Sequence, residues 1–298
     1  MHFSRLSRLF LAAALFSPSL VLAAASAEAP PKPVRVLLIA GGCCHDYAAQ
    51  RDLLKAGLEA RARIEMDVIY TDSRSMTHIF EELNKPGWAQ GYDVILHNQC
   101  TANTRDMAVI ESVLAPHKLG LPAVFIHCAM HTFRTEGWNT QPPAVTPWFE
   151  FTGLQTTGHG AQQPITLSWV DGEHPIVRGL IPWTTGNEEL YNNPGGIFST
   201  SKPVIRGRQG TNETVVAWTS LYKEKAKTFG ITLGHNTPTI GDPRFLDVIA
   251  RGILWSVDKL NDTYLKPPPV SSTAAPSALL APTNASTAPS ANPSPVPR

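Results

Sequence analysis

The sequence lacks any excess of one charge. Its 298 residues hold 25 Lys and Arg against 24 Asp and Glu, a formal net charge of +1, and charged residues make up only 16% of the chain. Proteins that bind nucleic acid through its phosphates carry a strongly basic surface, so we expect no nucleic-acid partner. No acidic block is present that would attract a basic partner.

Cysteines and long apolar stretches are also scarce. Four cysteines are too few for a small scaffold built on disulfides. After the N-terminal segment no run of about 18 apolar residues occurs, so no membrane span is expected there. What the chain does have is a 43% share of hydrophobic residues, which is enough to form a core and argues against wholesale disorder.

The two ends differ in composition from the middle. Residues 1–27 are typical of a secretory signal peptide, because Arg5 and Arg8 precede an apolar run and small residues at 25–27 offer a cleavage site. We therefore expect a periplasmic or secreted protein, with an uncleaved anchor as the alternative. Residues 28–33 would form a short linker and residues 34–265 the folded domain. Residues 266–298, rich in Pro, Ser, Ala and Thr, would form a disordered tail.

Short apolar runs alternate with helical patterns through the first half of the folded part. Strands are expected at residues 34–40, 64–70, 92–97 and 122–127, and helices at residues 47–61, 76–83 and 103–114. Strands that are apolar on both faces and alternate with helices predict an α/β fold, with a mostly parallel sheet covered on both sides.

The second half is less regular. Strands are expected at residues 164–170, 204–206, 214–219 and 228–233, with an irregular insertion at about residues 135–193. A final helix is well marked, because Asp242 is a good N-cap and Pro243 stands at the first helical position.

Polar loops follow four of the expected strands. They contain His45, His97, His127 and His235. The carboxyl ends of parallel strands meet at one edge of an open sheet, where ligands bind, so we expect these loops to converge. Histidine there serves as a metal ligand or as a general acid or base. His45, His127 and His235 are therefore the central candidates, as catalytic residues or as ligands of a divalent metal such as zinc.

Other residues near these loops are secondary candidates. Glu189 is the candidate catalytic carboxylate, although Glu188 and Glu189 could instead be a solvated pair at a helix start. His127 and His131 have the spacing of metal ligands on one helical face, but no Glu accompanies them in an H-E-x-x-H pattern. The expected substrate contacts come from Asp46, Cys128, His131, His159, Tyr191 and Asn236.

The cysteines allow more than one interpretation. Cys128 follows a strand and could act as a nucleophile, but its neighbours His127 and Ala129 are not the glycines of a sharp elbow. A disulfide between the adjacent Cys43 and Cys44 would be strained, and either could instead approach Cys100. We favour a structural disulfide or buried free thiols over catalysis.

Several segments together resemble the ThuA-like family, named after a trehalose-utilisation protein. They are residues 37–50, 124–134, 174–180, 187–191, 216–222 and 232–255. The resemblance implies a flavodoxin-like three-layer α/β sandwich similar to class I glutamine amidotransferases, and a link to carbohydrate metabolism that includes keto sugars. That superfamily uses a Gly-x-Cys-x-Gly elbow and a late His-x-Glu pair. This chain has His127-Cys128-Ala129 and Gly234-His235-Asn236 instead, which argues against glutamine hydrolysis.

The function expected from this resemblance is that of an exported enzyme acting on a glycoside or keto sugar by hydrolysis or elimination. His45, His127, His235 and Glu189 would supply acid–base or metal-assisted catalysis. Trp138, Trp148 and Tyr191 could stack on a sugar, although such aromatics more often pack in a core. The alternatives are a non-catalytic sugar-binding protein and a Cys128-dependent amidotransferase-like hydrolase. A small saccharide is the expected partner, and a homo-oligomer stays open.

Overall fold

The computed structural model describes residues 30–141 and 144–267. The expected signal peptide, and all but the first two residues of the expected tail, lie outside the described residues. The chain divides into two units, Met1–Lys32 and Pro33–Arg298, and the description below concerns the second unit.

Strands dominate this unit. They are β1 (Val34–Gly42), β2 (Ile64–Tyr70), β3 (Val94–Cys100), β4 (Ala123–Ile126), β5 (Gln163–Trp169), β6 (Thr184–Glu188), β7 (Ser201–Gln209), β8 (Asn212–Tyr222) and β9 (Ala226–Ile231). They form one sheet in the order β2-β1-β3-β4-β9-β8-β7-β5-β6. The strands from β2 to β9 pair in parallel, and those from β9 to β6 pair antiparallel. The parallel part has the strand order of flavodoxin-like folds.

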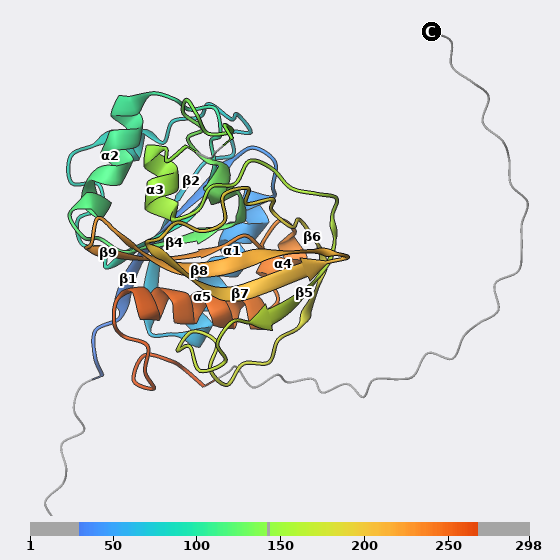
Figure 1. The fold of residues 1–298 in the computed structure, drawn as a ribbon. Helices are drawn as coiled ribbons and strands as arrows, with labels where there is room; N and C mark the ends of the chain where they lie inside the picture. The colour runs from blue at the N-terminus through green and yellow to red at the C-terminus, as the bar shows by residue number, and fades with distance from the viewer. Residues whose placement is uncertain (1–29, 142–143, 268–298) are drawn as a thin grey trace, which may run out of the picture. The chain divides into compact units, whose positions relative to one another are not determined.

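Helices cover both faces of the sheet, as Figure 1 shows. They are α1 (Tyr47–Arg61), α2 (Met107–Lys118), α3 (Pro147–Thr152), α4 (Thr237–Ile240) and α5 (Pro243–Ser256), with short 3₁₀ helices η1 (Glu81–Asn84) and η2 (His127–His131). Helices α1 and α5 pack on one face, and α2 and α3 pack on the other. The predicted α/β sandwich with parallel central strands is therefore confirmed.

Alternation along the strands explains the two cores. In β1, Val36 and Leu38 point into the core under α1 and α5, whereas Leu37 and Ile39 point into the core under α2 and α3. Successive side chains of a strand point to opposite faces, so a strand buried on both sides has to be apolar at every position. This is why β1 was recognisable in the sequence.

Some sequence predictions were wrong in detail. The helix expected at residues 76–83 is absent, and only η1 forms near its end. The helix expected at residues 103–114 begins at Met107, because Asp106 caps it by accepting a hydrogen bond from the Ala108 amide. The insertion at residues 135–193 is more regular than expected, since it contains α3, β5 and β6.

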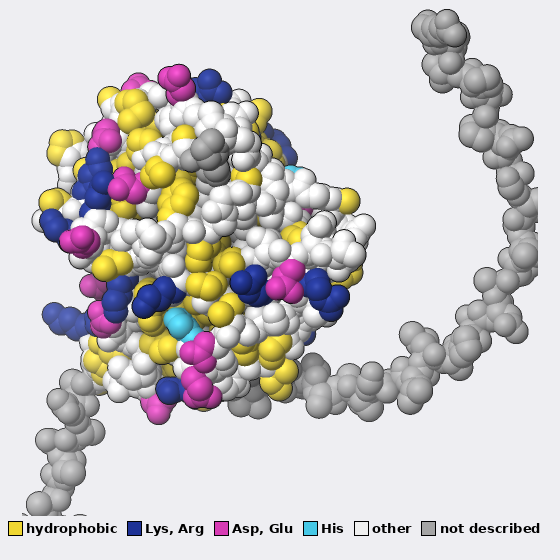
Figure 2. Space-filling model, in the orientation of Figure 1, with side chains coloured by type: hydrophobic (Ala, Val, Ile, Leu, Met, Phe, Trp, Pro, Cys, Tyr) yellow, Lys and Arg dark blue, Asp and Glu magenta, His cyan; other side chains and the backbone are white. Residues whose placement is uncertain are grey.

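Charged side chains show no segregation on the face drawn in Figure 2, where Lys and Arg stand among Asp and Glu. None of the helices in the described residues is both long and apolar enough to cross a membrane.

Candidate functional site

A pocket of about 370 Å³ opens where β1, β3, β4 and β9 end. We call it the histidine pocket. The residues that line it are Cys43, Cys44, His45, Met76, Cys100, Ala102, Cys128, His131, Arg134, Thr157, Gly158, His159, Glu189, Tyr191 and His235. A larger hollow of about 590 Å³ lies elsewhere, between residues 85–90 and α2, but no acid, histidine or cysteine lines it. The histidine pocket is therefore the candidate site.

Three histidines predicted to converge do so at this pocket. The His45 ring centre lies 4.8 Å from that of His127 and 4.7 Å from that of His235, and the last two are 5.3 Å apart. His45 and His235 come from the loops after β1 and β9, and His127 begins η2 directly after β4. The rule that ligand sites gather at the carboxyl ends of such strands thus located the cluster correctly.

Tight backbone turns at two strand ends bring these loops together. Gly42 ends β1 with φ +96°, and an added Cβ there would collide with the carbonyl group of Cys100. Gly234 precedes His235 with φ +115°, and its added Cβ would lie 2.9 Å from the Ile126 side chain. Both positions therefore require glycine, which alone adopts such angles without steric cost.

His127 is held in one orientation. Its φ of +47° is unusual for a residue with a side chain. Its ring Nδ1 lies 2.7 Å from the Thr232 carbonyl oxygen. Because a carbonyl only accepts, Nδ1 carries a proton and donates it. In the neutral ring the free lone pair is then on Nε2, which lies 3.4 Å from Glu189 Oε2.

Glu189 is the carboxylate that the histidines share. Its Oε2 lies 3.4 Å from Nε2 of both His127 and His159, and its Oε1 lies 3.1 Å from His235 Nδ1. Burial alone would raise the pKa of Glu189, but the neighbouring His127, together with His235 and His159, outweighs burial and lowers the pKa. Glu189 is thus an ionised carboxylate at neutral pH.

His45, His131 and His235 are neutral near pH 7. Burial, together with the neighbouring His127 and His235, lowers the pKa of His45 to about 3. Burial also lowers the pKa of His235, although Glu189 opposes the shift. Burial, followed by the charge of Arg134, holds the pKa of His131 well below its usual range. Each ring therefore offers a lone pair as well as an N–H group.

Glu188 has a structural role that the sequence did not reveal. It is fully buried at the end of β6, so the interpretation as a solvated helix start was wrong. Its carboxylate accepts hydrogen bonds from the backbone N–H groups of Gly234, His235 and Asn236 at 3.1–3.3 Å. Glu188 thereby fixes the loop that carries His235.

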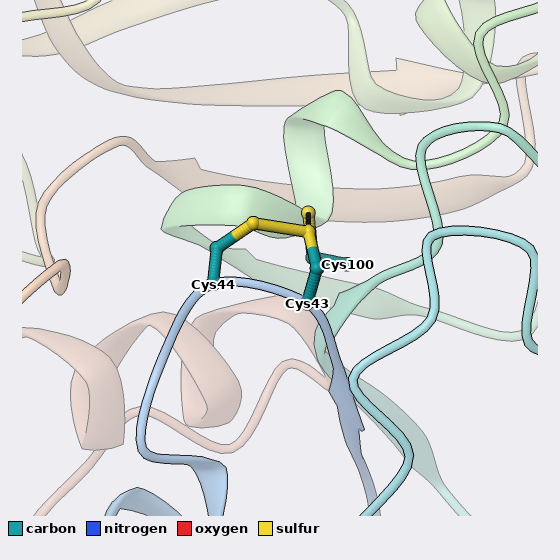
Figure 3. Close-up of side chains that lie close together, drawn as sticks. All are labelled: Cys43, Cys44 and Cys100. Carbon is teal, nitrogen blue, oxygen red and sulfur yellow. Dashed lines mark hydrogen bonds between the residues drawn. A yellow bond between two sulfur atoms is a disulfide. The ribbon is translucent and has the colours of Figure 1, made fainter.

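The four cysteines form two disulfides, Cys43–Cys44 and Cys100–Cys128. Cys43 does approach Cys100, as one of the open alternatives had it, but Cys100 bonds to Cys128, because η2 brings Cys128 to the end of β3. Figure 3 shows Cys100 against the Cys43–Cys44 bridge, and the sulfurs of Cys43 and Cys100 are 3.6 Å apart. A disulfide sulfur is not a thiolate, so Cys128 is not a nucleophile in this state.

His131, His159 and Tyr191 lie around the three converging histidines. His131 stacks on Tyr191 with ring centres 4.4 Å apart, and its Nε2 lies 3.2 Å from Thr156 Oγ1. Since η2 is a 3₁₀ helix with three residues per turn, residues four apart do not share a face. His127 and His131 therefore do not form the ligand pair that their spacing suggested. His159 is 40% exposed at the rim.

Four other candidates lie outside the histidine pocket. Asp46 caps α1, and Asn236 precedes α4 and donates to the Asn187 carbonyl. Trp148 is buried in the core and donates to the Ala129 carbonyl, so it cannot stack on a ligand. Trp138 lies under the Arg134 guanidinium and lines a different hollow.

His97 lies inside β3, not in a loop after it. It faces the core on the α2 side, where its Nε2 lies 3.5 Å from that of His117.

Sequence reasoning also missed Gln162. Its side-chain amide lies 2.7 Å from His235 Nε2 and 3.5 Å from Glu189 Oε1. Nothing in the sequence marks this residue, because it stands in an irregular segment before β5 and reaches His235 only through the fold.

Comparison with known proteins agrees with the fold. A family model described as trehalose utilisation (ThuA) matches residues 35–256. A solved structure described as ThuA-like, from Parabacteroides merdae, aligns with a TM-score of 0.55 and 20% identity over 76% of this chain and 90% of that chain. Another, from Bacteroides uniformis, gives 0.52 and 15% over 79% and 96%.

Two further comparisons add nothing on function. A glutamine amidotransferase from Thermotoga maritima aligns over 76% of this chain and 96% of its own, with a TM-score of 0.39 and 10% identity, which is too weak for an argument. A search of curated proteins found no match.

Proposed function

The chain belongs to the ThuA family of trehalose utilisation, and from this we propose that it is an enzyme of carbohydrate metabolism acting on a small keto sugar or its glycoside. The observation that carries the proposal is the buried Glu189 carboxylate, held by three histidines at a pocket edge. The pocket, at about 370 Å³, is at the small end of the roughly 300–1,000 Å³ usual for small-molecule sites, which suits a sugar unit.

The chemistry of a keto sugar matches these groups. A carbonyl makes the neighbouring C–H bond acidic, and Glu189 is the group placed to take that proton. The electron pair forms an enolate, whose oxygen a polar donor has to stabilise. In an elimination, the enolate expels the glycosidic oxygen, and that oxygen then needs a proton. His159, at the rim beside Glu189, is placed to give it.

A turnover screen tests this function. The mature protein would be incubated with keto glycosides prepared by oxidation of trehalose and simple glucosides, beside the unoxidised parents. We expect product from the keto compounds and little from the parents, because only the former have an acidified C–H bond. Saccharide binding by calorimetry with no product from any compound would contradict the enzyme and favour a non-catalytic binding protein.

The proposed compartment is periplasmic or extracellular, and the proposed ligand is a small saccharide with no nucleic-acid partner. Residues 1–27 support export by composition, and the two disulfides suit an oxidising compartment. The intact mass of protein from the exported fraction should correspond to residues 28–298 minus four hydrogen atoms. Full-length protein with alkylatable thiols, found only inside the cell, would contradict export.

A further inference from the structure

We propose that His45, His127 and His235 bind one divalent transition-metal ion of the zinc type, with Glu189 beside its open coordination position. Each residue offers one ligand nitrogen, and the three nitrogens lie within 4.8 Å of one another. The proposal rests on the geometry of the histidine pocket and does not depend on the proposed sugar chemistry.

Unpartnered nitrogens are the main observation. Both ring nitrogens of His45 are buried and have no hydrogen-bond partner within the described residues. Nε2 of His127 and Nδ1 of His235 are also buried, and each faces the Glu189 carboxylate, at 3.4 and 3.1 Å, without hydrogen-bond geometry. A buried polar atom without a partner typically costs about 1–3 kcal/mol, so such atoms seldom gather without a ligand. Here they face one another from three separate loops.

The distances among the three histidine nitrogens are close to those found around a bound metal ion. A tetrahedral ion with Zn–N bonds of about 2.0–2.1 Å sets its nitrogens about 3.4 Å apart. Nitrogens that lie within 4.8 Å of one another reach this spacing by side-chain motion on the order of 1 Å, with no change in the strands.

Neighbouring groups contact the second ring nitrogen of two of the three histidines. The Thr232 carbonyl holds the proton of His127 on Nδ1, which leaves Nε2 as the ligand atom. The amide nitrogen of Gln162 lies 2.7 Å from Nε2 of His235. For Nδ1 of His235 to be the ligand atom, this amide has to turn over so that its oxygen accepts the Nε2 proton. Histidine ligands in metal sites are held in this manner by hydrogen bonds to their second nitrogen.

The donor set selects the class of ion. Imidazole nitrogens suit zinc, copper, iron and nickel, whereas calcium and magnesium prefer oxygen ligands. The nearby sulfurs of Cys43, Cys44 and Cys100 are not competitors, because disulfide sulfur is not a thiolate. The Glu189 carboxylate lies within 3.4 Å of two of the rings and offsets the charge of a cation. When bound, such an ion would polarise a carbonyl or lower the pKa of a water molecule.

The experiment measures the metal directly. Mature protein without a His tag would be freed of metal, loaded with zinc alone, and assayed by plasma mass spectrometry and calorimetry. We expect one zinc per chain, and binding weakened by more than about 100-fold in His45→Ala, His127→Ala and His235→Ala, because even changes outside the ligands cost about 10–100-fold. The control is His174→Ala, which alters a histidine beside Trp255, outside the pocket.

A second pair of variants guards against misfolding. Gln162 and Gln163 are adjacent and exposed, but only the Gln162 side chain contacts His235. We expect Gln162→Ala to weaken zinc binding by about 10–100-fold and Gln163→Ala to leave it unchanged. Cobalt(II) bound in place of zinc should show the visible bands of tetrahedral nitrogen and oxygen coordination without a thiolate charge-transfer band.

The outcomes separate this proposal from the proposed function. A wild-type protein that binds no zinc or cobalt overturns the metal site, even if keto sugars are turned over. Equal loss of zinc in His174→Ala, or retention in all three histidine variants, also overturns it. Stoichiometric zinc with no turnover of any saccharide supports the metal site and counts against the sugar chemistry alone.

Discussion

Replacement of Glu189 by Gln lowers the turnover of the keto-sugar substrate by about 10²–10⁴-fold, the usual contribution of a general base. Glutamine has nearly the same shape but cannot accept the proton. Among the residues that line the histidine pocket, Glu189 is the one carboxylate, so no second carboxylate can replace it. The measurement is kcat with the best substrate from the turnover screen, together with a thermal melt to show that the variant is folded.

The matched control is Glu173→Gln, because Glu173 is an exposed glutamate in the turn after β5. It should keep the wild-type kcat. If folded Glu189→Gln also kept the wild-type kcat, Glu189 would not be the base. A raised KM with unchanged kcat would instead assign Glu189 to substrate binding.

The parallel half of the fold was predictable because burial on both faces leaves a clear mark. β1 is apolar from Val36 to Ala40 and β3 begins with the apolar run Val94–Leu96, since helices cover both sides of these strands. The start of α5 was predictable for a local reason, because Asp242 accepts a hydrogen bond from the Arg244 amide and Pro243 needs no partner. Both signals come from a few adjacent residues.

The antiparallel half was harder because its strands gain their partners from far along the chain. β6 was not predicted, since Thr184–Glu188 contains no apolar residue and is held by pairing with β5. β7 extends well beyond the predicted residues 204–206, because its pairing with β5 and β8 orders both of its ends. Propensity within such a segment cannot show pairing of this kind.

In the candidate site too, some residues could be predicted from local sequence and others only from the fold. The gathering of His45, His127 and His235 follows from topology, because each stands just after a parallel strand. Glu189 was a candidate by residue type, but its place beside them depends on β6, which was not predicted. The loss of Cys128 as a candidate nucleophile depends on its bond to Cys100 at the end of β3. The number of residues between Cys100 and Cys128 in the sequence does not show how close the two cysteines lie in the fold.

Replacement of Glu188 by Ala lowers the free energy of unfolding by about 3 kcal/mol or more, since hydrogen bonds to a charged group contribute about 1.5–3 kcal/mol each. The substitution leaves the N–H groups of Gly234, His235 and Asn236 without their buried acceptor. Urea unfolding of the two proteins measures the difference. Glu188→Gln should lose less, because its amide oxygen still accepts one or two of the three bonds.

The control for Glu188 is Glu213→Ala, which removes an exposed carboxylate on β8 that faces Arg206 at 3.6 Å. An exposed ion pair of this kind contributes about 0–1 kcal/mol, so the control should stay near the wild type. If Glu188→Ala were no less stable than this control, the three hydrogen bonds to Glu188 would not contribute to the stability of the fold. Zinc binding by the Glu188→Ala protein then tests whether Glu188 positions the His235 ring. A stable variant that has lost zinc would show that Glu188 positions His235 without stabilising the fold, because the three N–H bonds fix the loop that carries this ring.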